Sequence, residues 1–172
     1  MKLLKNISAL SLLITLSSCG QEATFQEDVM TYLKSNGTAK QYNYAYDELL
    51  KMLGNQFPKT TENTTGWDYL EANKEKHVSE ILSLLEPVYV KNFTHEEIKK
   101  MNAFYKSEAG KQLVADGEKL TEDQKKEVND FYGSETGKTI VEKQQVLATE
   151  IGKVSEGWSR DLYETALSML KQ

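Results

Sequence analysis

The strongest constraint on this chain is an internal repeat. Residues 93–114 read FTHEEIKKMNAFYKSEAGKQLV, and residues 120–141 read LTEDQKKEVNDFYGSETGKTIV. Aligned with an offset of 27, the two copies agree at ten of 22 positions. Self-similarity of this kind indicates one supersecondary unit that occurs twice in the fold.

The repeated unit predicts a helix, a corner and a second helix. Each copy opens with a threonine followed three residues later by Glu97 or Gln124, which is the capping-box pattern of a helix start. Apolar residues then recur at helical spacing. Ser107 and Ser134, each followed by glutamate, indicate the start of the next helix, because serine caps a helix and an acid favours its N-terminus. The corner motif comprises Thr94, Phe104, Tyr105, Ser107, Gly110, Thr121, Phe131, Tyr132, Ser134 and Gly137.

Glycine recurs in the first turn of the second helix of each unit, at Gly110 and Gly137. Because glycine costs a helix about 1 kcal/mol relative to alanine, its presence in both copies predicts a contact too close for a Cβ. We expect the phenylalanine of each corner to wedge against the glycine of the same corner. An alternative function for the corner serines is nucleophilic catalysis, but no histidine follows either of them, and capping is the ordinary role of serine at such a place.

The pattern Tyr-x-x-x-Phe-Thr-x-Glu-Glu-Ile … Ala-Phe-Tyr-x-Ser-x-x-Gly-Lys resembles the bacterial family named domain of unknown function 2059. The resemblance covers roughly residues 25–170 and implies an all-helical, exported bacterial protein with no known chemistry. Glu108 and Ala109 stand where the family commonly has Ser-Pro, which leaves the corner less rigid. The pattern is carried here by Tyr89, Phe93, Thr94, Glu96, Glu97, Ile98, Ala103, Phe104, Tyr105, Ser107, Gly110 and Lys111.

Residues 1–18 predict a lipoprotein signal peptide. Lys2 and Lys5 precede an apolar stretch that is too short for the about 20 residues of a membrane-spanning helix. Residues 16–19 read LSSC and resemble a lipobox, which implies cleavage before Cys19 and acylation of that residue. Cys19 is the only cysteine, so a role in lipidation explains it where a disulfide within the chain cannot. The alternative is an ordinary signal peptide with a coincidental cysteine.

The predicted anchor places the protein in the cell envelope. Residues 19–24 form a lipidated tether, and residues 25–172 form the domain, which faces the periplasm or the cell surface. Gly20 in place of an acid favours the outer over the inner membrane, by resemblance to the sorting rule of better-known lipoproteins. The formal net charge of −5 becomes −7 once the two lysines of residues 1–18 are removed. This charge argues against nucleic acid as a partner.

Residues 25–172 predict an all-α single-domain helical bundle with a long C-terminal helix. A first helix should end at Asn36 and Gly37, and a second at Gly54, followed by a loop over residues 54–66. A third should run from Trp67 to Tyr89, with Pro87 kinking or restarting it near Leu82 and Ser83. The last helix should carry a coiled-coil-like seam, and its glycines, Gly152 and Gly157, mark close helix contact or a bend. The seam consists of Ile140, Gln144, Leu147, Ile151, Val154 and Trp158.

The sequence shows no pattern typical of catalysis, of metal binding or of a cofactor site. His77 lies at the edge of an apolar stripe and is expected to pack there, whereas His95 is expected to be solvated. Zinc needs three or four ligands, usually with short local spacing, and two separate histidines do not supply them. The acidic clusters lie on first helical turns, where they favour the helix dipole. We therefore expect no enzyme activity, no cofactor and no metal.

Two classes of function remain, of which a structural or interaction module for another envelope protein is the preferred one. The alternative is a carrier that holds a small lipid or hydrophobic ligand between its helices. An enclosed volume lined by tyrosine and methionine favours carriage, and an exposed aromatic patch favours partner binding. Four large aromatic side chains are expected in the core, namely Trp67, Phe104, Phe131 and Trp158.

Lys111 and Lys138 recur in both copies of the repeat without an obvious packing role, so they are possible interaction residues. A simpler interpretation is that each forms an i,i+3 pair with the glutamate of its own corner, Glu108 or Glu135.

Overall fold

The chain is divided into helices, most of which begin at a side-chain cap. The computed structural model describes residues 23–171, and Cys19, the signal peptide and most of the tether lie outside that range. Within the range, the chain is all-helical, as the sequence predicts. The elements are α1 (Phe25–Ser35), α2 (Thr38–Gln56), α3 (Thr64–Ala72), α4 (Lys74–Asn92), α5 (His95–Lys106), α6 (Glu108–Asp116), the 3-10 helix η1 (Gly117–Lys119), α7 (Glu122–Gly133) and α8 (Glu135–Leu170).

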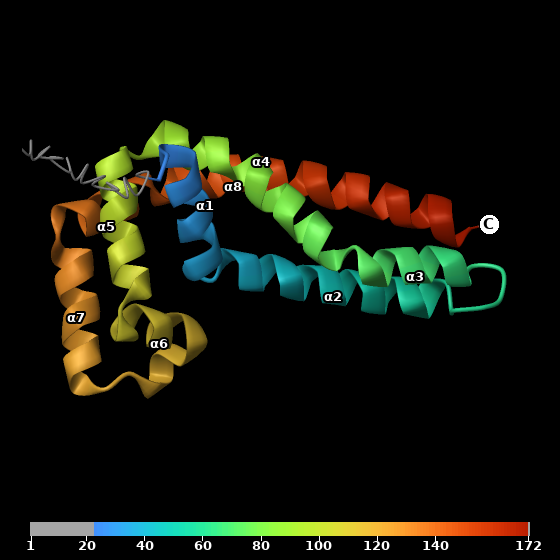
Figure 1. Cartoon of the computed structure of the whole chain (residues 1–172), viewed down its shortest axis with the longest axis horizontal. Coiled ribbons are helices and arrows are strands. Elements are labelled where there is room, and N and C mark those ends of the chain that lie inside the picture. The colour runs from blue at the N-terminus through green and yellow to red at the C-terminus, as the bar shows by residue number, and fades with distance from the viewer. Residues whose placement is uncertain (1–22, 172) are drawn as a thin grey trace, which may run out of the picture.

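The molecule is elongated (Figure 1). α4 and α8 extend along its long axis, and α2 lies on the other side of α4. The repeat units, which comprise α5, α6, α7 and the first turns of α8, occupy one end near α1. The connection from α2 to α3 and the C-terminus occupy the opposite end. Among the described residues, no helix combines the length and the apolar character that crossing a bilayer requires.

Two clusters of buried side chains hold the helices together. The larger joins α1, α4, α5 and α8, and the smaller joins α2, α3 and the end of α8 through Leu53, Trp67 and Leu70. The predicted seam of α8 is confirmed, because one of its residues is buried in the larger cluster and four more pack against it. These are Ile140, Leu147, Ile151, Val154 and Trp158. Of the four aromatic residues expected in the core, Trp67 and Phe104 are buried, whereas Phe131 and Trp158 are half-buried and pack against the larger cluster.

The helix expected over residues 67–89 is instead two helices, and the break lies at Asn73. At Asn73 the backbone leaves the helical conformation, with φ −104° and ψ 13°. α4 then continues through Pro87 without the restart expected near Leu82.

The expectations for the glycines outside the repeat are confirmed at one position and not at the others. Gly37 has φ +93° between α1 and α2, as a glycine after a helix end should. Gly54 lies inside α2, which continues to Gln56. A Cβ on Gly152 or Gly157 would meet nothing within 4 Å. The close helix contact expected at these two positions of α8 is therefore absent.

Candidate functional site

The two repeat corners are built by the local hydrogen bonds that the sequence predicts. Thr94 and Thr121 each take part in a capping box with the side chain three residues later. The hydroxyl oxygen of Ser107 accepts from the Gly110 N–H, and that of Ser134 from the Gly137 N–H, both at 3.2 Å. The Ser134 hydroxyl also donates to the Phe131 carbonyl at 2.6 Å.

The corner glycines are required by the backbone, not by an aromatic ring. A Cβ on Gly110 would lie 2.1 Å from the Phe104 carbonyl oxygen, and one on Gly137 would lie 2.4 Å from the Phe131 carbonyl oxygen. The prediction of a close contact is confirmed. The prediction that the phenylalanine ring makes that contact is wrong, because each ring turns toward the other repeat.

The four rings of the two repeats form one cluster in which equivalent residues meet. Phe104 stacks on Phe131, and the Tyr105 and Tyr132 hydroxyls are 3.2 Å apart. The crossed contacts are reciprocal: Phe104 to Tyr132 is 6.3 Å at 71°, and Tyr105 to Phe131 is 6.4 Å at 73°. Burial, reinforced by the hydrogen bond to Tyr132, raises the pKa of Tyr105. The cluster fixes the two units against each other.

The recurring lysines lie on the surface of the corner units. Lys111 pairs with Glu108 at 2.8 Å, which agrees with the simpler interpretation of that lysine. Lys138 is exposed, and within residues 23–171 it forms no ion pair. The corner motif therefore brings structural residues together and leaves the two lysines at its edge.

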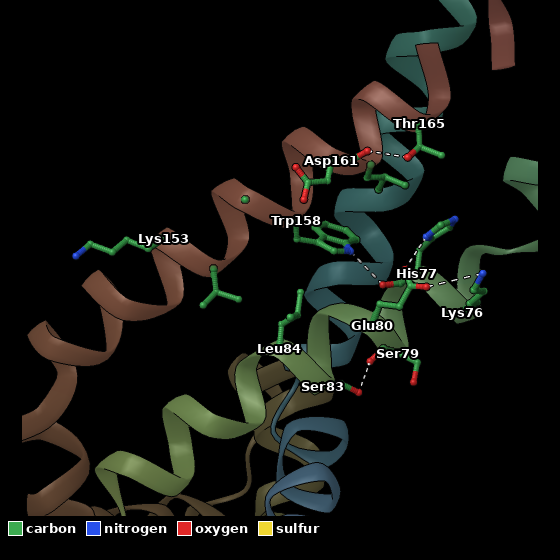
Figure 2. Close-up of a pocket in the computed structure, with 13 residues that line it drawn as sticks. Lys76, His77, Ser79, Glu80, Ser83, Leu84, Lys153, Trp158, Asp161 and Thr165 are labelled. Atoms are coloured by element: carbon green, nitrogen blue, oxygen red, sulfur yellow. Dashed lines mark hydrogen bonds and ion pairs between the residues drawn. The ribbon is translucent and has the colours of Figure 1, made fainter. Parts of the chain in front are cut away.

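A groove between α4 and α8 is the feature of the fold that sequence reasoning missed. Its volume is about 890 Å³. The side chain of Trp158 extends from α8 toward α4, and its indole N–H donates to the His77 carbonyl at 3.2 Å (Figure 2). Leu84 stands on the α4 side and is 52% exposed. The lining residues are Lys76, His77, Ser79, Glu80, Ser83 and Leu84 of α4, with Lys153, Val154, Gly157, Trp158, Asp161, Leu162 and Thr165 of α8.

Two sequence signals point to this groove in retrospect. Leu84 lies outside the apolar stripe of its helix, whose neighbouring members Ile81 and Leu85 are fully buried. Gly157 stands beside Trp158 in the seam of α8 and has open space where a Cβ would be. A glycine in a helix next to a large aromatic residue leaves a hollow beside that residue. Neither signal is decisive without the position of α4.

His77 packs at the α3 end of the groove, as expected. Its Nδ1 donates to the Glu80 carboxylate at 2.9 Å, and its ring stacks on Tyr46 with 5.8 Å between centroids. Tyr46 is fully buried and donates to the Leu70 carbonyl at 2.8 Å. Burial raises the pKa of Tyr46 to about 12. These contacts connect the groove to the smaller core cluster.

His95 is not solvated as the sequence suggested. Its Nε2 lies 2.8 Å from the Asp28 carboxylate of α1, and its ring stacks on Phe25 at 5.0 Å. The Asn102 side chain donates to the Asp28 carbonyl at 2.9 Å, so three residues hold the start of α1 against α5. The sequence separation of 67 residues between His95 and Asp28 explains why no local pattern indicates this contact.

In the part of the chain that the structure describes, no three histidine, cysteine, aspartate or glutamate side chains gather where they could hold a metal ion. The hydroxyls of both corner serines are engaged with backbone groups. The candidate site is therefore an open, largely apolar groove between α4 and α8, and the pair of packed corner units lies at the end of the molecule near α1.

Comparison with protein families gives one match. The model described as "Uncharacterized protein conserved in bacteria (DUF2059)" matches residues 79–122 and 117–164, so its two segments follow the two repeat units. Neither a curated protein nor a solved structure matches the chain.

Proposed function

Because the chain belongs to the DUF2059 family of bacterial proteins, we propose that it is an exported, lipid-anchored envelope protein that binds another envelope protein and catalyses no reaction. The LSSC run that ends at Cys19 supports the anchor. A tether of residues 19–24 spans at most about 20 Å. The end of the molecule that carries α1 and the corner units then lies nearest the membrane.

The observation that carries the binding proposal is the groove between α4 and α8. Trp158, Val154 and Leu162 give it an apolar floor, and the exposed Leu84 stands at its rim. An apolar surface framed by charged residues is typical of a site for protein partners. The groove lies between α4 and α8, which pack against each other, so the fold holds its walls at a fixed spacing.

The carrier alternative receives less support from the same groove. An enclosed volume lined by tyrosine and methionine would favour carriage of a small lipid. The residues that line this groove include neither type, and the groove opens to solvent along its length. A hydrophobic ligand in it would stay partly in contact with water.

We propose that the protein catalyses no reaction, because its potentially reactive side chains have structural roles. The corner serines cap helices, and neither contacts a histidine. His77 lies beside Glu80 and two tyrosines. Within residues 23–171, no hydroxyl that could act as a nucleophile forms a hydrogen bond with the His77 ring.

The test is recovery of partners from detergent-solubilised envelope, with proteins and lipids both identified. We expect Leu84→Lys to abolish recovery of a specific protein partner while thermal stability is unchanged, because Leu84 is exposed. Lys111→Glu with Lys138→Glu is the matched surface variant, and loss of recovery there would place the interface on the repeats. Recovery that Leu84→Lys leaves unchanged would refute the groove as the binding site.

A further inference from the structure

The two walls of the groove are parallel stripes of helical surface. On α8 the lining residues recur at every turn from Lys153 to Thr165, and on α4 they extend from Lys76 to Leu84. At 1.5 Å of rise per residue, these walls are about 18 and about 12 Å long. A groove of this length between two helices matches two to three turns of a third helix.

The shape of the groove favours an occupant with two different faces. Its floor is apolar, at Trp158, Val154 and Leu162, but its mouth is open to solvent. An acyl chain would leave half of its surface in water, whereas an amphipathic helix buries an apolar stripe and exposes a polar one.

The charged residues at the rim of the groove indicate which charge a partner should carry there. Glu80 is engaged by His77 at 2.9 Å and by Lys76 at 3.9 Å, and Asp161 is engaged by Arg160 at 3.0 Å. The lysine at the end near Leu84, in contrast, forms no ion pair within residues 23–171. This residue is Lys153.

Lys153 forms no direct ion pair with Glu150, the acid one turn before it, although its charge contributes to lowering the pKa of that carboxyl. The carboxylate of Glu150 is held by Lys91 and by the side-chain amide of Asn92 at 2.9 Å. The exposed Lys153 side chain points away from Trp158 and Leu84 (Figure 2), and its flexible stem allows the ammonium group to turn toward an occupant of the groove. Within residues 23–171, Lys153 is therefore the charged residue of the rim that has no direct ion pair.

We infer that the groove receives an amphipathic helix of a partner protein, with apolar residues at i, i+3 or i+4, and i+7, and with an acidic residue beside that stripe facing Lys153. This inference rests on the proposed function and specifies its partner. The apolar stripe covers Trp158 and Leu162, and the acid lies at the Leu84 end of the groove.

Two side chains of the protein can report on binding in the groove. The chain's only two tryptophans are Trp67 and Trp158, so a ¹⁵N–¹H correlation spectrum holds two indole signals. Trp158 donates to His77 in the groove, whereas Trp67 donates to the Phe57 carbonyl at the far end of α2. Binding in the groove should move the Trp158 signal and leave the Trp67 signal in place. Trp158→Phe assigns the two signals.

The probe is a synthetic helical peptide of about 14 residues, rich in alanine and glutamine, with leucines on one face and a single glutamate beside them. The full chain with Cys19→Ser is titrated with this peptide, with a peptide of the same composition whose leucines surround the helix, and with palmitate. We expect saturable movement of the Trp158 signal with the first peptide only. Equal movement with the second peptide, or movement with palmitate alone, overturns the inference.

A charge swap tests the acidic residue. Lys153→Glu should weaken binding of the glutamate peptide by about three- to ten-fold, and a peptide with lysine in place of glutamate should restore it. Lys138→Glu, an exposed lysine of the same helix outside the groove, is the control and should change nothing. Equal loss in both variants contradicts a specific role for Lys153. A failed titration alongside Leu84-dependent partner recovery rejects the helix and keeps the groove as the binding site. Partner recovery that does not depend on Leu84 rejects the groove as the site, and recovery of no specific protein rejects the binding function.

Discussion

Phe104 and Phe131, which occupy the same position in the two repeats, stack face to face with 4.0 Å between centroids and 1° between ring planes. The tyrosines that follow them meet through their hydroxyls, and the crossed contacts are equal within 0.1 Å and 2°. Reciprocal contact between equivalent residues is the signature of an isologous interface, here formed within one chain. The duplicated unit thus packs against its own copy.

The ring stack should couple the stabilities of the two repeats. In a double-mutant cycle with Phe104→Leu and Phe131→Leu, we expect a coupling free energy of about 0.5–1.5 kcal/mol in urea unfolding, because each single change already removes the stack. Phe104→Leu combined with Phe57→Leu is the control, because Phe57 packs against the other core cluster. Additive effects in the first cycle would show that the stack contributes no stability of its own.

The corner glycines should not tolerate a methyl group. Gly110→Ala and Gly137→Ala place a Cβ against a backbone carbonyl, which cannot move as a side chain can, and each should lower the free energy of unfolding by at least about 1–3 kcal/mol. Gly152→Ala is the matched control in α8, where a Cβ meets open space. There we expect a gain of about 0.5–1 kcal/mol. The thermal midpoints of the three variants decide the matter, and a neutral Gly110→Ala would contradict the close contact.

The corner serines should behave as helix caps. Ser107→Ala and Ser134→Ala should each cost about 1 kcal/mol, because one N–H at the start of the next helix loses its acceptor. Ser107→Asp should retain most of the stability, since aspartate caps as well as serine does. Chemical denaturation measures both. If partner recovery fails in Ser107→Ala at unchanged stability, the serine has a role beyond capping.

Tyr46 should contribute to alkaline unfolding. Its pKa is raised to about 12 in the fold by burial, against about 10 in an unfolded chain. The stabilisation is therefore complete below pH 10 and is lost as the pH rises through 12, amounting to at most about 3 kcal/mol. Tyr46→Phe should show a smaller loss of stability between pH 9 and about pH 12 than the parent. Identical pH profiles for the two proteins would exclude this tyrosine as a cause.

Cys19 should determine whether the protein is recovered in the membrane fraction or in the soluble fraction. Cys19→Ser removes the thiol that acylation requires, so we expect the protein to move from the membrane pellet to the soluble periplasmic fraction. Labelling with a radioactive fatty acid should disappear in the same variant. Retention of Cys19→Ser in the pellet, with no label in the parent, would refute the lipid anchor.

The local features of the fold can be predicted from the sequence because the residues that cause them lie within a few positions of each other. The threonine and serine caps bond to amides three positions away, and the seam of α8 follows helical spacing alone. The break between α3 and α4 at Asn73 was not predicted. The apolar residues keep helical spacing on both sides of Asn73, so the periodicity of the sequence gives no sign of the break.

What the sequence determined by itself is the class of the fold, the two copies of the helix–corner–helix unit and the places where most helices begin and end. The tertiary structure decided which surfaces those helices share. Phe104 turns toward Phe131, His95 toward Asp28 and Trp158 toward α4, across separations of 27 to 81 residues. Such contacts depend on how whole helices are placed, and no short-range pattern carries that information. The groove beside Trp158 exists for the same reason, since its two walls come from helices that approach only in the folded chain.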